Sequence, residues 1–179
     1  YNTLVVQDGR VRMDESTSEV LADWIRKGGK LICSANSVRS VADLPGVQLG
    51  DAKKVDSNAK RGEMNYSDRE RAYIPTMVPG AIYRTELDES HPLAFGLGDH
   101  YFSLKTNSVQ FDKMENGWNV GVINDDLVKI GFAGYLVHEA QKQSMVIGEQ
   151  SMGRGSIVFF TDDILYRGFW RRGQQLFSN

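Results

Sequence analysis

The residues best suited to nucleophilic chemistry follow a glycine pair in the first fifth of the chain. Gly28-Gly29 precedes the strand-like run 30–33, which ends in Cys33, the only cysteine, and residues 34–37 then supply two serines. In α/β proteins a sharp turn from a strand into a helix presents a nucleophile, and the amide groups of the following helix suit an oxyanion. This corner is therefore the first place to look for a hydrolase or transferase site.

Each candidate at the corner also has a structural explanation. Cys33 directly follows Leu31-Ile32, so we expect it inside the strand, where a buried cysteine behaves as a small apolar side chain. The glycines of the G-x-S-x-G turn are absent around Ser34 and Ser37, and Ser37 or Asn36 is explained as the N-cap of the next helix. We therefore predict no catalytic residue here and keep Ser34 and Asn36 as binding candidates.

A second group of candidates follows the strand-like run 156–161. Asp162 and Asp163 come at its carboxyl end, which is where open α/β sheets bind their ligands, and Arg167 follows closely. With Ser34 and Asn36, these three residues complete the predicted binding set at this edge of the sheet. The alternative is that one aspartate caps the last helix while Arg167 neutralises the other.

Composition and spacing argue against several other kinds of site. His91, His100 and His138 are far apart and none belongs to an H-x-x-E or H-E-x-x-H pair, so no metal site is predicted. A single cysteine excludes an internal disulfide framework. The net charge of -2, from 21 basic and 23 acidic residues, gives no reason to expect nucleic acid or an anionic membrane as a partner. No apolar stretch approaches the roughly 20 residues of a membrane helix.

Alternating strands and helices must position these residues. Residues 2–6 and 30–33 are typical of strands buried on both faces of a parallel sheet. Between them, Ser16 and Glu19 form a capping-box pattern that predicts a helix ending near Gly28. The result is a β-α-β unit with a right-handed crossover. A second helix should begin near Asn36 or Ser37 and end before Pro45-Gly46.

The remaining chain predicts one domain over residues 1–179. Residues 47–79 are polar and predict an excursion with one short helix. We expect strands at 81–87, 101–105 and 118–123, a helix at 133–141, a hairpin of 144–148 with 156–161, and a last helix over 166–177. This order predicts a flavodoxin-like three-layer α/β/α sandwich, with a mostly parallel sheet and an antiparallel hairpin near the C-terminus.

Several segments together resemble a known family. Residues 1–9, the helix after them and the run Gly-Gly-Lys-Leu-Ile at 28–32 resemble class I glutamine amidotransferase-like domains. Residues 90–97 (SHPLAFGL) and 153–163 (GRGSIVFFTDD), with RGFW at 167–170, sharpen the resemblance. They are similar to the amidotransferase-like domain that follows the catalytic domain in large bacterial zinc carboxypeptidases of the carboxypeptidase A type, which are common in Bacteroidetes.

The resemblance implies an accessory domain without catalysis of its own. Amidotransferases of this class place a cysteine at the corner after the glycine-pair strand and a histidine near the last strand. Here the corner falls on Ala35 or Asn36, and the last strand ends in Asp162-Asp163 without a histidine. The chain would be a fragment of a periplasmic or secreted protein, truncated at its first strand. It would hold no cofactor and would pack on, support or present substrate to an upstream peptidase domain that carries the zinc.

Two alternatives stay open. One is a hydrolase or transferase that uses Cys33, Ser34 or the aspartate pair, and it requires a histidine within hydrogen-bond reach of a nucleophile. The other is a binding module for a small ligand, such as a sugar or peptide, at the same edge; it requires an apolar pocket with convergent polar groups. An accessory domain instead predicts an exposed apolar patch that meets its neighbour.

Overall fold

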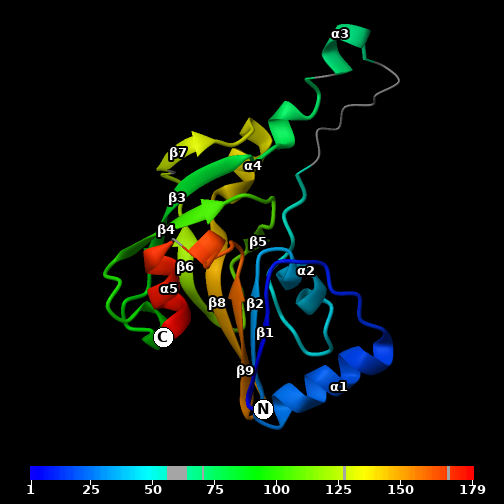
Figure 1. The fold of residues 1–179 in the computed structure, drawn as a ribbon, viewed down its shortest axis with the longest axis vertical. Helices are drawn as coiled ribbons and strands as arrows, with labels where there is room; N and C mark the ends of the chain where they lie inside the picture. Colours follow the sequence, from blue (N-terminus) through cyan, green and yellow to red (C-terminus); the bar gives the residue numbers. More distant parts are fainter. Residues whose placement is uncertain (56–63, 70, 127, 169) are drawn as a thin grey trace.

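A single mixed sheet forms the centre of the computed structural model (Figure 1), which describes residues 1–55, 64–69, 71–126, 128–168 and 170–179. The strand order is β1-β2-β9-β8-β6-β3-β4, with β5 beside β8 and β7 beside β3. The strands are β1 (Thr3–Val6), β2 (Lys30–Ser34), β3 (Gly80–Leu87), β4 (His100–Lys105), β5 (Phe111–Asp112), β6 (Trp118–Ile123), β7 (Lys129–Phe132), β8 (Ser144–Met152) and β9 (Gly155–Phe160). The helices are α1 (Glu15–Arg26), α2 (Ser37–Ala42), α3 (Tyr66–Arg69), α4 (Tyr135–Gln141) and α5 (Arg171–Ser178), with 3-10 turns η2 (Ile74–Thr76), η3 (Pro92–Ala94) and η4 (Tyr166–Gly168).

The N-terminal β-α-β unit forms as the sequence predicts. β1 and β2 are parallel, with Thr3 opposite Lys30, and β2 continues parallel to β9. The start of α1 differs from the expected capping box, because the side chain of Asp14 accepts the N–H of Thr17 at 2.8 Å and caps the helix. The helix ends before Gly28, whose φ of +117° is a conformation that side chains avoid.

The sheet is mixed, but the expectation of a mostly parallel sheet is wrong. In the described part of the chain, the parallel pairs are β1-β2 and β2-β9, and six further pairs are antiparallel. The predicted hairpin near the C-terminus is present as β8-β9. Strands β5 and β7 were not expected from the sequence. Apolar periodicity gives the spacing of a strand but not its direction, and therefore the error lies in strand direction.

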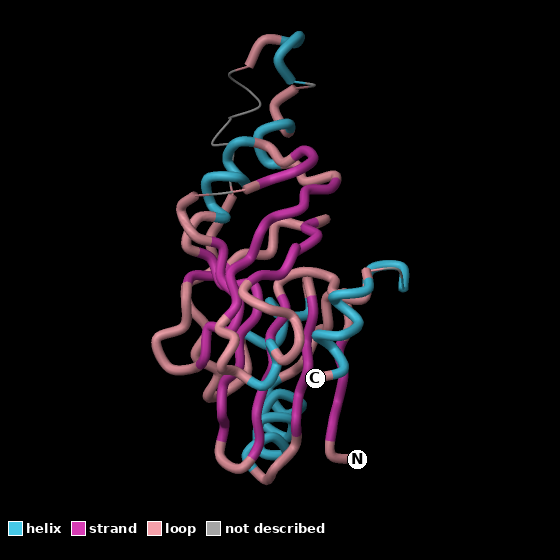
Figure 2. The backbone as a smooth tube through the Cα atoms, turned by 90° about the vertical axis from the view of Figure 1, so that its left-hand side faces the viewer, coloured by secondary structure: helices cyan, strands magenta, loops and turns pink. Residues whose placement is uncertain are grey.

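Helices cover both faces of the parallel part of the sheet (Figure 1). α1 and α2 pack on one face, in a core that includes Ile25, Val38 and Leu31. α5 packs on the other face, where Leu176 joins a core with Phe160. In Figure 2 the lower strands run nearly upright whereas the upper ones are inclined, so the sheet is strongly twisted along its length.

The polar excursion at 47–79 is only partly separate from the core. Its first residues pack against the sheet. The N–H of Gln48 donates to Oε1 of Gln150 on β8 at 2.8 Å, and Val47 contacts the core beneath α1 and α2. The short helix α3 stands away from the sheet (Figure 1). Residues 56–63 and 70 of this segment lie outside the described residues. None of the helices described is both long and apolar enough to cross a membrane.

Candidate functional site

The corner between β2 and α2 has the backbone of a nucleophile turn but carries alanine. β2 ends at Ser34, α2 begins at Ser37, and Ala35 between them has φ +51°. This left-handed conformation is costly for a residue with a side chain, and the hydrogen bond from Ala35 N–H to Phe160 O at 2.8 Å helps to hold it. The corner position therefore falls on Ala35, whose methyl group cannot act as a nucleophile.

The neighbouring thiol is inert. Cys33 is fully buried in the core beneath α1 and α2, as its place in the strand predicts, and its Sγ lies 3.4 Å from Val158 O. Burial raises the pKa of this thiol far above its ordinary value, so the thiolate that catalysis needs is not formed.

The two serines of the corner make structural bonds. Ser37 is buried, its hydroxyl has Val6 O and Ser34 O as acceptors within 2.8 Å for its single hydrogen, and its oxygen accepts the N–H of Ser34 at 3.0 Å. These bonds tie the ends of β1 and β2 to the start of α2. Ser34 itself lines a hollow beside the corner.

Asn36 is at the N-cap position of α2, as expected, but its side chain makes no capping hydrogen bond and binds an aspartate that sequence reasoning missed. Its backbone N–H and its Nδ2 both donate to Oδ1 of Asp8, at 3.0 and 2.9 Å. Asp8 lies just beyond β1, and its charge acts on Asp163, whose pKa is raised chiefly by burial and further by Asp8. The carboxyl ends of β1, β2 and β9 thus gather Asp8, Asn36 and Asp163 at one edge. This meeting follows from parallel strands ending together.

The adjacent aspartates at the end of β9 do not act as a pair. Asp162 points inward and is fully buried, where its Oδ2 accepts the hydroxyls of Ser103 at 2.7 Å and Tyr101 at 3.4 Å. Its Oδ1 has no hydrogen-bond partner among the described residues. Burial raises the pKa of this carboxyl. Of the two aspartates predicted for binding, only Asp163 lines the hollow, whereas Asp162 is buried behind it.

A buried lysine accompanies Asp162. The Nζ of Lys105 donates to Thr161 O at 2.6 Å, Thr161 Oγ1 at 2.9 Å and Val109 O at 2.8 Å. Burial lowers the pKa of Lys105 to about 8, whereas the charge of Asp162 opposes that change. Tyr101, Ser103 and Lys105 alternate along β4, and this run of polar residues at every second position is the signal that could have identified the cluster.

Arg167 is the remaining predicted residue, and it stands apart from the others. It is exposed, has φ +50°, and its guanidinium lies 5.1 Å from the centre of the Tyr166 ring. Within the described residues no ion pair joins Arg167 to Asp162 or Asp163, and α5 has no side-chain cap. Neutralisation by Arg167 is therefore not seen, whereas the carboxylate of Asp163 accepts a backbone hydrogen bond from Leu165, directly before η4.

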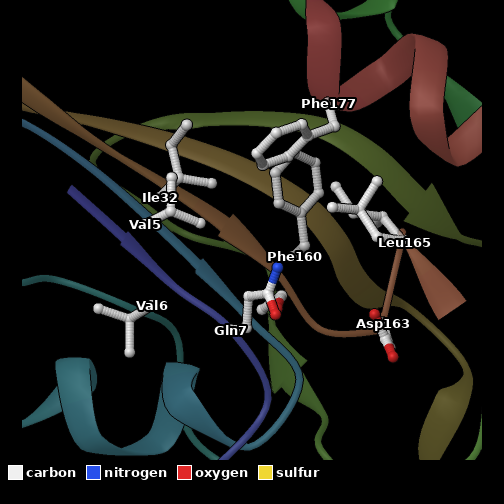
Figure 3. A pocket seen from close by; sticks show the side chains of 10 residues that line it. Val5, Val6, Gln7, Ile32, Phe160, Asp163, Leu165 and Phe177 are labelled. Carbon is white, nitrogen blue, oxygen red and sulfur yellow. The ribbon is translucent and has the colours of Figure 1, made fainter. Parts of the chain in front are cut away.

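The hollow beside the corner is too small for a sugar. Figure 3 shows Val5, Ile32, Leu165 and Phe177 around it, with Asp163 at one side. Its empty volume is about 260 Å³ when open solvent is counted, and its enclosed part holds about one water molecule. Pockets that bind small molecules typically span about 300 to 1,000 Å³. This edge of the sheet has polar side chains such as Asp163 at its surface, and apolar side chains fill the space beneath them.

The histidines are engaged elsewhere in the fold. His91 Nε2 lies 3.3 Å from Glu149 Oε2, His100 pairs with Asp99 at 2.5 Å, and the ring of His138 stacks on Tyr83 with centroids 6.0 Å apart. In the described part of the chain no hydrogen bond joins a histidine to the corner, and no group of three or more His, Cys, Asp or Glu side chains could hold a metal ion. The arrangement provides neither a nucleophile with a base nor a metal centre.

Comparisons with known proteins identify no family for this chain. No protein-family model matches the sequence, and no curated protein matches it significantly. Similar solved structures include a cytoplasmic protein from Salmonella typhimurium (14% identity, TM-score 0.45, covering 99% of this chain and 71% of that one). Two β-galactosidases are also similar, one from Rahnella sp. R3 (10% identity) and a GH42 enzyme from G. stearothermophilus (15%), each with TM-score 0.48 over 99% of this chain and 22% of theirs. At these identities and TM-scores the likeness supports no conclusion about activity.

Proposed function

We propose that this chain is a non-catalytic accessory domain of a zinc carboxypeptidase, following the peptidase domain and packed against it. The proposal includes a flavodoxin-like arrangement of the α/β/α layers, zinc held by the upstream domain and a periplasmic or secreted location. It starts from the resemblance of the sequence to such domains. One observation on the structure carries it further: an apolar sheet surface without a covering element.

That surface is the outer face of strands β7, β3 and β4. The register places Ile82 of β3 between Leu104 of β4 and Ile130 of β7 on the same side of the sheet. Phe102 lies on this side too, two residues from Leu104. Ile130 is 64% exposed and Phe102 36% exposed, and none of these side chains belongs to either core. We call these four residues the outer apolar face.

The opposite side of the same strands makes the outer apolar face unusual. It carries Tyr83, Tyr101, Ser103 and Lys105, all fully buried. An antiparallel sheet of a soluble protein ordinarily buries apolar residues on one face and presents polar ones to water on the other. The outer side also carries Arg84, opposite Phe102, and Glu86, opposite His100, so the outer apolar face is an apolar patch with charged residues at one end. An exposed apolar patch beside polar residues favours a protein neighbour that covers it.

The two alternatives have less support. An enzyme at the corner would need a nucleophile where Ala35 stands and a histidine that contacts it. A sugar-binding module would need more space than the hollow beneath Asp163 provides. Neither alternative explains the outer apolar face.

Binding between this chain and the peptidase domain tests the proposal. We expect the reading frame upstream of Tyr1 to encode a peptidase with an H-x-x-E zinc motif, and this domain, expressed separately, to bind the chain in isothermal titration calorimetry. Ile130→Lys should weaken binding at least tenfold, because it places a charge in the outer apolar face. The matched control is Val20→Lys on α1, 71% exposed on another surface, which should leave affinity unchanged. Equal affinity of both variants, or no upstream peptidase, contradicts the proposal.

A further inference from the structure

Strand β1 ends the sheet opposite to β4 and has an open edge. It pairs only with β2 within the described residues. Asn2 O accepts the N–H of Lys30 at 2.9 Å, so the backbone groups of Asn2 face β2. Since these groups alternate along a strand, the N–H and C=O of Thr3 and Val5 face outward.

The edge lacks the protection that such strands normally have. Proteins guard exposed edges with charges, prolines or bulges, whereas β1 reads Thr-Leu-Val-Val. Leu4 is 42% exposed and Val5 is 40% exposed. Val5 also extends the apolar lining of the hollow, beside Ile32 of β2 (Figure 3). A strand added here would gain both backbone hydrogen bonds and apolar contact.

Charges at the two ends of β1 indicate which strand fits. Lys30 stands opposite Thr3 at the beginning of β1, and it is exposed. Asp8 follows the end of β1, and its charge contributes to raising the pKa of Asp163 nearby. Lys30 is therefore the charge beside the start of the edge and Asp8 the charge directly after its end, with Arg10 and Arg12 in the segment that follows. An antiparallel partner with the same charge order sets Lys30 near the partner's Asp8, whereas a parallel one sets like charges together.

We propose that two copies of this chain associate through antiparallel pairing of their β1 strands, about a two-fold axis that continues the sheet across both. A second copy has the required charge order by construction, and Val5 of each copy covers apolar surface of the other. Because β1 and the outer apolar face lie at opposite ends of the strand order, this dimer does not compete with the proposed peptidase contact. The two proposals can therefore fail separately.

Light scattering after size-exclusion chromatography tests the dimer. At about 100 µM the chain should have a mass near twice its 20.1 kDa. Val5→Lys should give the monomer, because it places a like charge on both sides of the two-fold axis, and Val20→Lys should remain dimeric. Circular dichroism confirms that the variants are folded. A monomeric wild-type chain, or a folded Val5→Lys variant that remains dimeric, overturns the proposal.

Charge exchange tests the strand direction. Lys30→Glu and Asp8→Lys should each weaken the dimer at least tenfold, and the double variant should recover most of the affinity, because opposite charges face one another again. Additive weakening in the double variant contradicts the antiparallel arrangement. A folded Lys30→Glu variant with unchanged affinity contradicts it equally.

Discussion

Replacing Lys105 by methionine removes the buried ammonium group behind the end of β9. The substitution keeps the length of the side chain but deletes the donor that holds Thr161 O and Val109 O. It also removes the positive charge that favours ionisation of Asp162. Leaving buried carbonyl oxygens without their hydrogen-bond donor typically costs about 1 to 3 kcal/mol each. We therefore expect Lys105→Met to lower the free energy of unfolding at pH 7 by about 3 kcal/mol.

The pH dependence of this loss follows from the pKa of Lys105. Burial lowers that pKa from 10.5 to about 8, so between these values the unfolded chain binds a proton that the folded chain has released. The contribution of Lys105 to the free energy of unfolding should therefore rise with pH in this window. Over the whole interval from pH 8 to 10.5 the rise would be about 3 kcal/mol. Cys33 and Tyr83, whose pKa values are raised by burial, act in the opposite sense above about pH 9 and pH 10. The contribution of Lys105 is therefore taken from the difference between the wild type and Lys105→Met, in which those groups cancel, and the measurement should stop near pH 9.5. Over that shorter range the expected rise is about 2 kcal/mol.

Urea denaturation at several pH values measures the effect. The gap in unfolding free energy between the wild type and Lys105→Met should widen from pH 7.5 to about 9.5. Lys113→Met is the matched control, since Lys113 is exposed and lies outside the buried cluster around Lys105. A gap that stays constant with pH, or a Lys105→Met variant as stable as the wild type at pH 7, refutes the buried, partly neutral lysine.

Three further measurements probe the same fold. Asp162→Asn should gain stability relative to the wild type as pH rises from about 4 to 7. The reason is that the raised pKa of Asp162 makes the folded wild type hold a proton that the unfolded chain has lost. Free energies of unfolding in urea that change with pH equally in both proteins contradict this. Gly155→Ala should lower the free energy of unfolding by more than about 3 kcal/mol, since its Cβ would lie 2.1 Å from the backbone oxygen of Gly29. Gly80→Ala, whose Cβ would have nothing within 4 Å, should be within about 1 kcal/mol of the wild type. Thermal unfolding measures both variants, and equal losses of stability refute the packing around Gly155. Cys33 should react with Ellman's reagent only as fast as the chain unfolds, and labelling of the native chain at the rate of a free thiol contradicts its burial.

Local patterns predicted the elements near the corner well. The apolar run up to Cys33 after the glycine pair forms β2, and the strand after the final turn forms β9. The start of α1 was displaced because Asp14 competes with Ser16 for the same role and has the better geometry. The residue at the corner, Ala35, was one of the two positions expected from the sequence.

Nonlocal geometry explains what the sequence did not predict. Asp162 and Asp163 are neighbours, yet one points into the core because β4 lies over the end of β9 and offers the hydroxyls of Ser103 and Tyr101. A lysine in a strand suggests a solvent-facing position, and only the pairing of β3 with β4 shows that Lys105 lies inside. The open edge at β1 likewise follows from strand order, which apolar periodicity does not contain.

Hydrogen exchange at strand β7 tests the accessory role most directly. If a peptidase domain covers the outer apolar face as proposed, the amides of residues 129–132 should exchange at least tenfold more slowly in the whole parent protein than in this chain alone. Strand β2, inside the sheet in both samples, serves as the internal control. Equal exchange of residues 129–132 in the two proteins contradicts the proposed docking of this domain.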